Sequence, residues 1–117
     1  GVAAATSGAP RLFGFLVSYT WNPAGQWFAL REGKNVVGSE PGLEGSIPAD
    51  RALSGKHFSV MYRRGEVRIR DLDSTNATRV DGDEVWGDSV AVAHGSVIKA
   101  GDTTFQLVVV PSIPGAT

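Results

Sequence analysis

The sequence predicts an all-β fold, an antiparallel β-sandwich of about eight to eleven short strands. Turn-forming pairs such as Asn22-Pro23 and Asp81-Gly82 recur at short intervals and leave no interval for a long helix. Within residues 66–71, Val67 and Ile69 alternate with charged residues. This period of two is typical of a strand with one face in solvent.

The segments between these turns are rich in β-branched, aromatic and aliphatic residues, as strands are. Taken in order, we expect strands at residues 12–19, 26–30, 35–38, 58–62, 66–71, 89–92, 97–100 and 104–110. Arg64-Gly65 separates two of these segments by a pair that suits a tight hairpin turn. Short strands joined by tight turns leave the loops at one end of a sandwich free to carry function.

The length and composition limit the class of protein. A chain of 117 residues forms one domain of ordinary size. Its net charge of −1 gives no broad attraction to nucleic acid or to an anionic membrane, so we expect neither as a partner. The absence of cysteine excludes disulfides, thiolate zinc sites and cysteine nucleophiles, and no cofactor is expected.

The two ends differ from the middle of the chain. Residues 1–10 and 111–117 are rich in Gly, Pro, Ala and Ser, and we expect a flexible N-terminal linker or tag and a flexible C-terminal tail. The folded domain is expected at residues 11–110. The longest apolar run, Leu107 to Val110, is far shorter than a membrane span.

Two fragments resemble catalytic or metal sites in three ways but lack the required surroundings. The stretch from Asp71 to Thr75 fits the D-x-D-x-T pattern of phosphatases, whose chemistry normally lies at the end of a parallel strand with crossover helices. The same stretch lacks the glycine and the glutamate of a calcium loop. Ser54 and His57 lack the strand-to-helix elbow of a serine nucleophile. We therefore expect no enzyme and no metal site.

The residues between 28 and 108 resemble the forkhead-associated (FHA) domain, a β-sandwich that binds phosphothreonine. Landmarks of that family are a Gly-Arg pair, a Ser-x-x-His, a Ser/Thr-x-Asn-Gly-Thr turn followed by Asn-Gly, and a Gly-Asp before the last strand. The chain has, in this order, Gly38-Ser39, Ser54-Gly55-Lys56-His57, Ser74-Thr75-Asn76-Ala77-Thr78, Asp81-Gly82 and Gly101-Asp102.

The resemblance assigns a role to each landmark. It implies that the Ser54 and Thr75 hydroxyls contact the phosphate, which offers three acceptor oxygens. Asn76 would hold the backbone of the bound peptide. His57 would tie the Ser54 loop to the Thr75 loop, with Gly38 as further structural support. The alternative is that these residues are ordinary turn residues and a core histidine.

Two positions depart from the family pattern. Ser39 stands where the family has its phosphate-binding arginine, and Ala77 stands where it has a glycine. Losing a charged hydrogen bond of about 1.5–3 kcal/mol weakens binding roughly tenfold to a hundredfold. The resemblance therefore implies that Ser39 lines the phosphopeptide site but brings no charge to it. The substitute cation is sought among Lys34, Arg51, Lys56 and Arg79, with Arg51 and Lys56 favoured because they flank Ser54.

The expected function is a non-catalytic signalling module that recruits a phosphothreonine-containing protein, in the cytoplasm as is usual for the family. The alternative is an FHA fold that has lost phosphate recognition and binds a partner, or a second copy of itself, without phosphorylation. Exposure of Trp21, Trp27 or Trp86 favours that alternative, because aromatic residues anchor interfaces.

Overall fold

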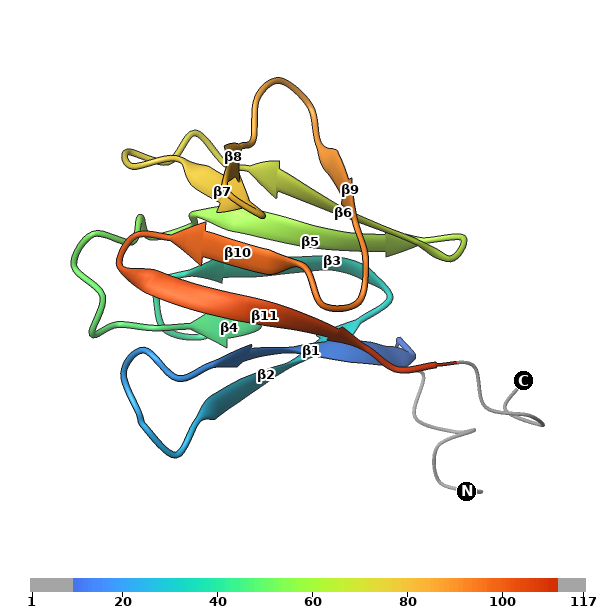
Figure 1. The fold of residues 1–117 in the computed structure, drawn as a ribbon, viewed down its shortest axis with the longest axis horizontal. Helices are drawn as coiled ribbons and strands as arrows, with labels where there is room; N and C mark the ends of the chain where they lie inside the picture. Colours follow the sequence, from blue (N-terminus) through green and yellow to red (C-terminus); the bar gives the residue numbers. More distant parts are fainter. Residues whose placement is uncertain (1–9, 112–117) are drawn as a thin grey trace.

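The computed structural model describes residues 10–111, and every regular element in this range is a β-strand. Eleven strands form two facing sheets, which confirms the predicted all-β sandwich (Figure 1). The segments predicted to be flexible are residues 1–10 and 111–117, and all but residues 10 and 111 lie outside the described residues, so the domain limits stay predictions. Residues 10–111 contain no helix that is long and apolar enough to cross a membrane.

The first sheet has six strands, and all its pairings are antiparallel. Their order across the sheet is β2 (Gln26–Arg31), β1 (Leu12–Ser18), β11 (Thr103–Val109), β10 (Val97–Ala100), β7 (Thr78–Val80) and β8 (Asp83–Glu84). The first and last of the described strands, β1 and β11, are therefore neighbours inside this sheet.

The second sheet has five strands in the order β4 (Gly45–Ser46), β3 (Gly33–Gly38), β5 (Phe58–Arg63), β6 (Glu66–Asp71) and β9 (Val90–Val92). Strand β4 pairs parallel with β3, in contrast to the antiparallel pairing of its other strands. Arg64 and Gly65 join β5 to β6 with positive φ angles of 53° and 80°, as a two-residue type I′ turn requires. The predicted hairpin turn is confirmed.

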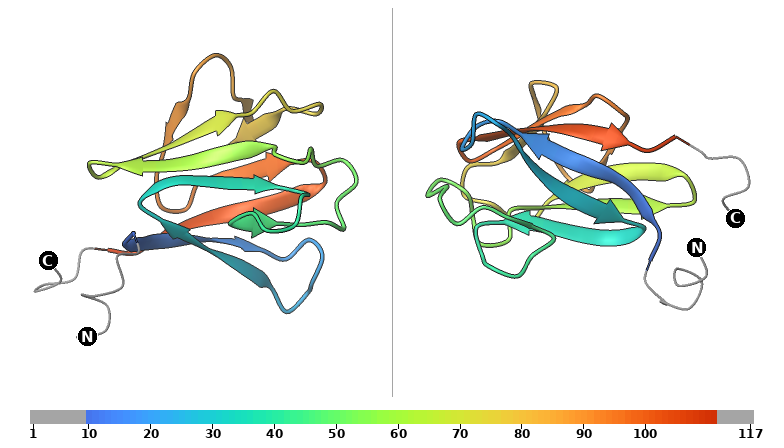
Figure 2. Two further views of the ribbon diagram at one scale, coloured as in Figure 1. Left: turned by 180° about the vertical axis from the view of Figure 1, so that it is seen from behind. Right: turned by 90° about the horizontal axis from the view of Figure 1, so that it is seen from below.

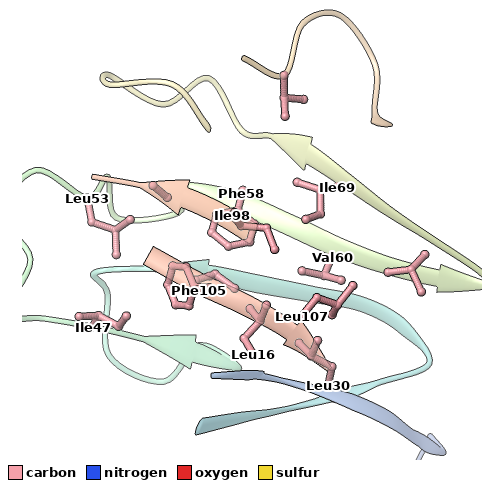
Figure 3. Close-up of a cluster of buried hydrophobic side chains, with 14 of the residues drawn as sticks. Leu16, Leu30, Ile47, Leu53, Phe58, Val60, Ile69, Ile98, Phe105 and Leu107 are labelled. Carbon is pink, nitrogen blue, oxygen red and sulfur yellow. The ribbon is translucent and has the colours of Figure 1, made fainter. Parts of the chain in front are cut away.

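The core lies between the two sheets and is made mainly of the inward-facing residues of their strands, with a few residues from the loops (Figure 3). Phe58 of the second sheet and Phe105 of the first are fully buried and meet edge to face, with ring centroids 5.7 Å apart. Burial of a side chain of this size contributes about 1.5–3 kcal/mol, so this contact between sheets is a main source of stability. Leu16, Leu30 and Ile69 are fully buried in the same cluster.

The loops of the sandwich are divided between two ends. The β3–β4, β4–β5, β6–β7 and β10–β11 connections gather at one end, on the left of Figure 1, and the rear view in Figure 2 shows the same grouping. The β5–β6 hairpin, the start of β1 and the end of β11 lie at the opposite end. The site residues predicted from the sequence lie at the end of β3, before β5 and after β6. They are therefore all at the end where these four connections gather.

Candidate functional site

His57 connects two of the loops at this end. Its ring is fully buried. The backbone N–H of Ser54 donates to Nδ1 at 3.0 Å, and Nε2 lies 2.7 Å from the carbonyl oxygen of Ala77. Because Nδ1 accepts a hydrogen bond, the proton of the neutral ring is on Nε2 and is donated to Ala77. One side chain thus fixes the separation of the β4–β5 and β6–β7 loops.

Two further hydrogen bonds join the same loops. The backbone N–H of Thr75 donates to Oγ of Ser54 at 3.1 Å, and Nδ2 of Asn76 donates to the carbonyl oxygen of Ala52 at 2.9 Å. The hydroxyl hydrogens of Ser54 and Thr75 have no acceptor among residues 10–111. Asn76 likewise keeps its side-chain oxygen and one N–H. Donors from two loops therefore converge on one exposed place.

The end of β3 packs directly on the Ser54 loop. The backbone N–H of Ser39 donates to the carbonyl oxygen of Ser54 at 3.0 Å, and that of Glu40 donates to Gly55 at 3.2 Å. A Cβ on Gly38 would overlap the carbonyl oxygen of Gly55, so only glycine permits this approach. Gly38 and Ser39 therefore lie beside Ser54, as the sequence indicates.

Ala77 has a φ of 65°, in the left-handed region that alanine rarely adopts. This conformation aims its carbonyl oxygen at the buried His57 ring. The alanine thus takes a backbone conformation suited to the glycine of the FHA pattern, at the cost of local strain.

Asp71 organises the start of the β6–β7 loop. Its carboxylate accepts hydrogen bonds from the hydroxyls of Ser74 and Thr78, at 2.5 and 2.6 Å, and from the backbone N–H of Ser74 at 3.0 Å. Burial raises the pKa of Asp71, but these hydrogen bonds outweigh the effect of burial, and the pKa falls below its usual value. The first aspartate of the D-x-D-x-T stretch is thus bonded within its own loop.

Asp50 is a residue that the sequence analysis missed. It is only 1% exposed, and it accepts hydrogen bonds from the N–H of Ala52 at 2.9 Å, the N–H of Asp102 at 2.9 Å and the hydroxyl of Thr103 at 2.6 Å. It joins the Ser54 loop to the β10–β11 turn. The bond to Ala52 is the local kind that an aspartate often forms with the N–H two residues later, so the sequence carries a signal for it. The other two partners lie about fifty residues away, and no local pattern indicates them.

The four candidate cations lie in different places. Arg51 and Lys56 are exposed in the Ser54 loop and form no ion pair within the described range. Lys34 lines a hollow on the outer face of the second sheet with Arg68 and Arg70, away from the Ser54 loop. Arg79 lines a hollow that Asn76 shares. The sequence analysis favoured Arg51 and Lys56 over Arg79, but the structure places Arg79 beside Asn76.

Aromatic side chains are exposed on the surface. Trp21, Trp27 and Trp86 are 41%, 67% and 78% exposed. Trp27 lies on β2, an edge strand of the first sheet. The exposure that would favour phosphorylation-independent binding is therefore present.

Comparisons with known proteins identify the family. A family model described as the inner membrane component of T3SS, cytoplasmic domain, matches residues 19–110. The FHA domain-containing protein FhaA of Mycobacterium tuberculosis is 30% identical over 81 residues, which are 64% of this chain and 15% of that protein. The chain therefore spans only a small part of this curated relative.

Two solved FHA domains have the same fold. One, from a study of phosphothreonine-dependent FHA domain interactions, has a TM-score of 0.75 and 26% identity, with 86% of this chain and 99% of that chain covered. The FHA domain of FhaA, complexed with the intracellular domain of another protein, has a TM-score of 0.70 and 26% identity, with 80% and 98% covered. The chain belongs to the family of the cytoplasmic domain of the T3SS inner membrane component, which is an FHA-type domain.

Proposed function

We propose that this domain binds phosphothreonine-containing proteins in the cytoplasm, as a non-catalytic recruitment module. FHA domains are protein-interaction modules, and two of the similar solved domains come from a phosphothreonine-dependent interaction study and from a complex with a partner domain. The family model that matches is that of a cytoplasmic domain, which supports the location. The proposal concerns this domain and not the activity of any longer protein.

The observation that carries the proposal is the pair of cross-linked loops. Because Oγ of Ser54 accepts from the Thr75 N–H, the hydroxyl hydrogen of Ser54 is free to donate to a ligand, and Thr75 lies next to it. A phosphate with three acceptor oxygens and about −1.5 to −2 charges matches converging donors of this kind. Asn76 would then hold the peptide backbone through its remaining amide groups. The rigid connection through His57 keeps the donors in place before the ligand arrives.

Positive charge near the phosphate is the weak point of the site. Ser39 lies against the Ser54 backbone but has a short neutral side chain. Arg51 and Lys56, exposed in the same loop, supply the charge in this proposal. Because both are flexible and solvated, we expect weaker binding than an arginine at position 39 would give.

An NMR titration of the isotope-labelled 117-residue chain tests the proposal. The ligands are a degenerate phosphothreonine peptide mixture and the same mixture without phosphate. We expect phosphate-dependent shifts at Ser54, Thr75 and Asn76, and none at Gly65 at the opposite end. Equal shifts with both mixtures, or none with either, contradict the proposal.

Three variants test which residues supply the positive charge near the phosphate. Ser39→Arg should tighten phosphopeptide binding by about tenfold or more, whereas Gln106→Arg, which adds the same charge on an exposed position of β11, should change it less than twofold. Replacing Arg51 and Lys56 together by alanine should weaken binding of the unmodified domain. Unchanged affinity in that double variant rules out their role as the cations.

The exposed tryptophans favour a second candidate function, binding without phosphorylation to a partner or to a second copy of the chain. Trp27 lies on an edge strand, where unpaired backbone groups also invite pairing, and its ring packs against Phe15 at 5.8 Å. Sedimentation of the unmodified chain and of Trp27→Ser over a range of concentrations tests self-association. A dimer that the substitution dissociates supports this function, and a monomer at all concentrations contradicts self-association.

A further inference from the structure

Arg79 and Lys99 form a pair of like charges beside the proposed peptide site. They are direct partners across β7 and β10, and both are exposed on the outer face of the first sheet. The residues that flank them, Thr78, Ile98 and Ala100, are buried. Like charges directly opposite each other in a sheet are destabilising, so this pair lowers stability unless an anion offsets it.

The anions within residues 10–111 offset this pair only slightly. Glu84 approaches Arg79, with Oε1 3.8 Å from Nη2, in a partly exposed ion pair of the kind that contributes little. Lys99 has no ion pair among the described residues. Asp50 lies behind Gly101, but it is buried and already accepts three hydrogen bonds from its own surroundings.

A hollow of about 100 Å³ lies between the two cations and the proposed site, lined by Asn76, Ala77, Arg79, Lys99 and Gly101. No acidic residue is among these five. The hollow has room for a small group such as a carboxylate, and its lining includes the guanidinium-bearing residue that binds carboxylates with two parallel hydrogen bonds. Asn76 belongs both to this hollow and to the set of loop donors near Ser54.

We propose that this hollow binds an acidic side chain of the ligand, and that Arg79 and Lys99 thereby select phosphothreonine peptides that also carry Asp or Glu. The inference rests on the proposed function. A peptide held by Asn76 in an extended conformation advances about 3.3 Å per residue. The selected acidic residue therefore lies within about three positions of the phosphothreonine.

The test uses phosphothreonine peptides with a neutral background and one Asp, placed in turn at each position from three before to three after the phosphothreonine. Each is compared with the peptide that has Asn at the same position. We measure dissociation constants with the full 117-residue chain and with the double variant Arg79→Gln/Lys99→Gln. The control is Lys34→Ala/Arg70→Ala, which removes the same charge from the outer face of the other sheet. Dispersed NMR spectra establish that each variant is folded.

For the unmodified chain, we expect about fivefold tighter binding of the Asp peptide than of the Asn peptide at one position or at two adjacent positions. The ratio should fall to near one in Arg79→Gln/Lys99→Gln and stay near five in Lys34→Ala/Arg70→Ala. The lost charges also weaken attraction to the phosphate at long range, but they do so equally for the Asp and Asn peptides. The ratio of the two dissociation constants for one variant is therefore free of this effect.

The remaining outcomes overturn the inference in distinguishable ways. Phosphate-dependent binding with no preference for Asp leaves the proposed function standing and rejects the acidic subsite. A preference that persists in Arg79→Gln/Lys99→Gln assigns it to other residues. If the Asn peptide loses as much affinity as the Asp peptide in that variant, the two cations act on the phosphate and not on an acidic side chain, which rejects the subsite. If no phosphopeptide binds at all, the proposed function and the inference are both wrong.

Discussion

At the scale of single residues, both ring nitrogens of His57 are occupied, and each binds a backbone group of a different loop. His57→Ala leaves the Ser54 N–H and the Ala77 carbonyl without these partners and opens a cavity at a fully buried position. We expect the free energy of unfolding to fall by about 3 kcal/mol. Urea denaturation measures this loss. The exposed neighbour Lys56→Ala should change it by less than about 0.5 kcal/mol, and a similar small change in His57→Ala would contradict the connecting role.

The left-handed conformation of Ala77 leads to a stabilising substitution. Ala77→Gly removes the strain of a Cβ at a φ of 65° but increases the conformational freedom of the unfolded chain. The first effect is larger, so we expect the free energy of unfolding to rise by about 0.5–1 kcal/mol. Ala91→Gly, on the exposed face of β9, should lower it by a similar amount. If the free energy of unfolding fell equally in both variants, the Ala77 backbone would not be strained.

At the scale of strands and loops, the site depends on the close contact between the end of β3 and the Ser54 loop. Gly38→Ala forces these two backbones apart, because the added methyl group overlaps the Gly55 carbonyl. We expect a loss of about 1–3 kcal/mol in the free energy of unfolding. NMR shift changes should be concentrated at residues 39, 40, 54 and 55. Ser39→Ala, which keeps the backbone contact, is the control, and shifts of equal size there would contradict this account.

The β6–β7 loop should make stability depend on pH in the acidic range. The pKa of Asp71 is lowered in the folded state by its hydrogen bonds, so its carboxylate stabilises the fold above the unfolded pKa of about 3.9. This contribution is lost as the pH falls through the lower, folded-state pKa. Denaturation at a series of pH values should show a smaller acid-induced loss for Asp71→Asn than for the unmodified chain. Asp73→Asn, which changes a neighbouring carboxylate with no hydrogen bond among residues 10–111, should keep the full loss.

The longer strands could be predicted from sequence because their side chains alternate or form apolar runs between clear turns. Strands β4, β7 and β8 have two or three residues each, and they exist through pairing with β3 and β10 and with each other. So short a segment carries no period of its own. The parallel pairing of β4 likewise depends on the path of the chain and not on its composition.

The candidate site could be predicted in part. The order of Gly38, Ser54, His57, Thr75 and Asn76 along the chain indicates loops that meet, and the structure brings them together. The roles of these residues in binding stay predictions. Asp50 and Lys99 could not be found in this way, because their neighbours at the site come from distant parts of the chain.

At the scale of the whole molecule, the two ends of the sandwich carry different segments of the chain. The loops that carry the proposed site gather at one end, and the start of β1 and the end of β11 lie at the other (Figure 1). Substitutions at the β5–β6 hairpin should therefore leave phosphopeptide binding unchanged within a factor of two, as titration of Arg64→Ala would measure.

The pairing of β1 with β11 also determines how the domain responds to mechanical force. Gly14 lies opposite Val109, and the N–H of Val110 donates to the Phe13 carbonyl at 2.7 Å, so the two strand ends are adjacent. Tension between residues 11 and 110 opens this ladder one hydrogen bond at a time, whereas tension between residues 11 and 102 shears all its bonds together. Since the chain has no cysteine, paired cysteines introduced at these positions give unique attachment points for single-molecule pulling. The first pair should unfold at the lower force, so a load transmitted through both strand ends would peel the domain open from the end farthest from its site.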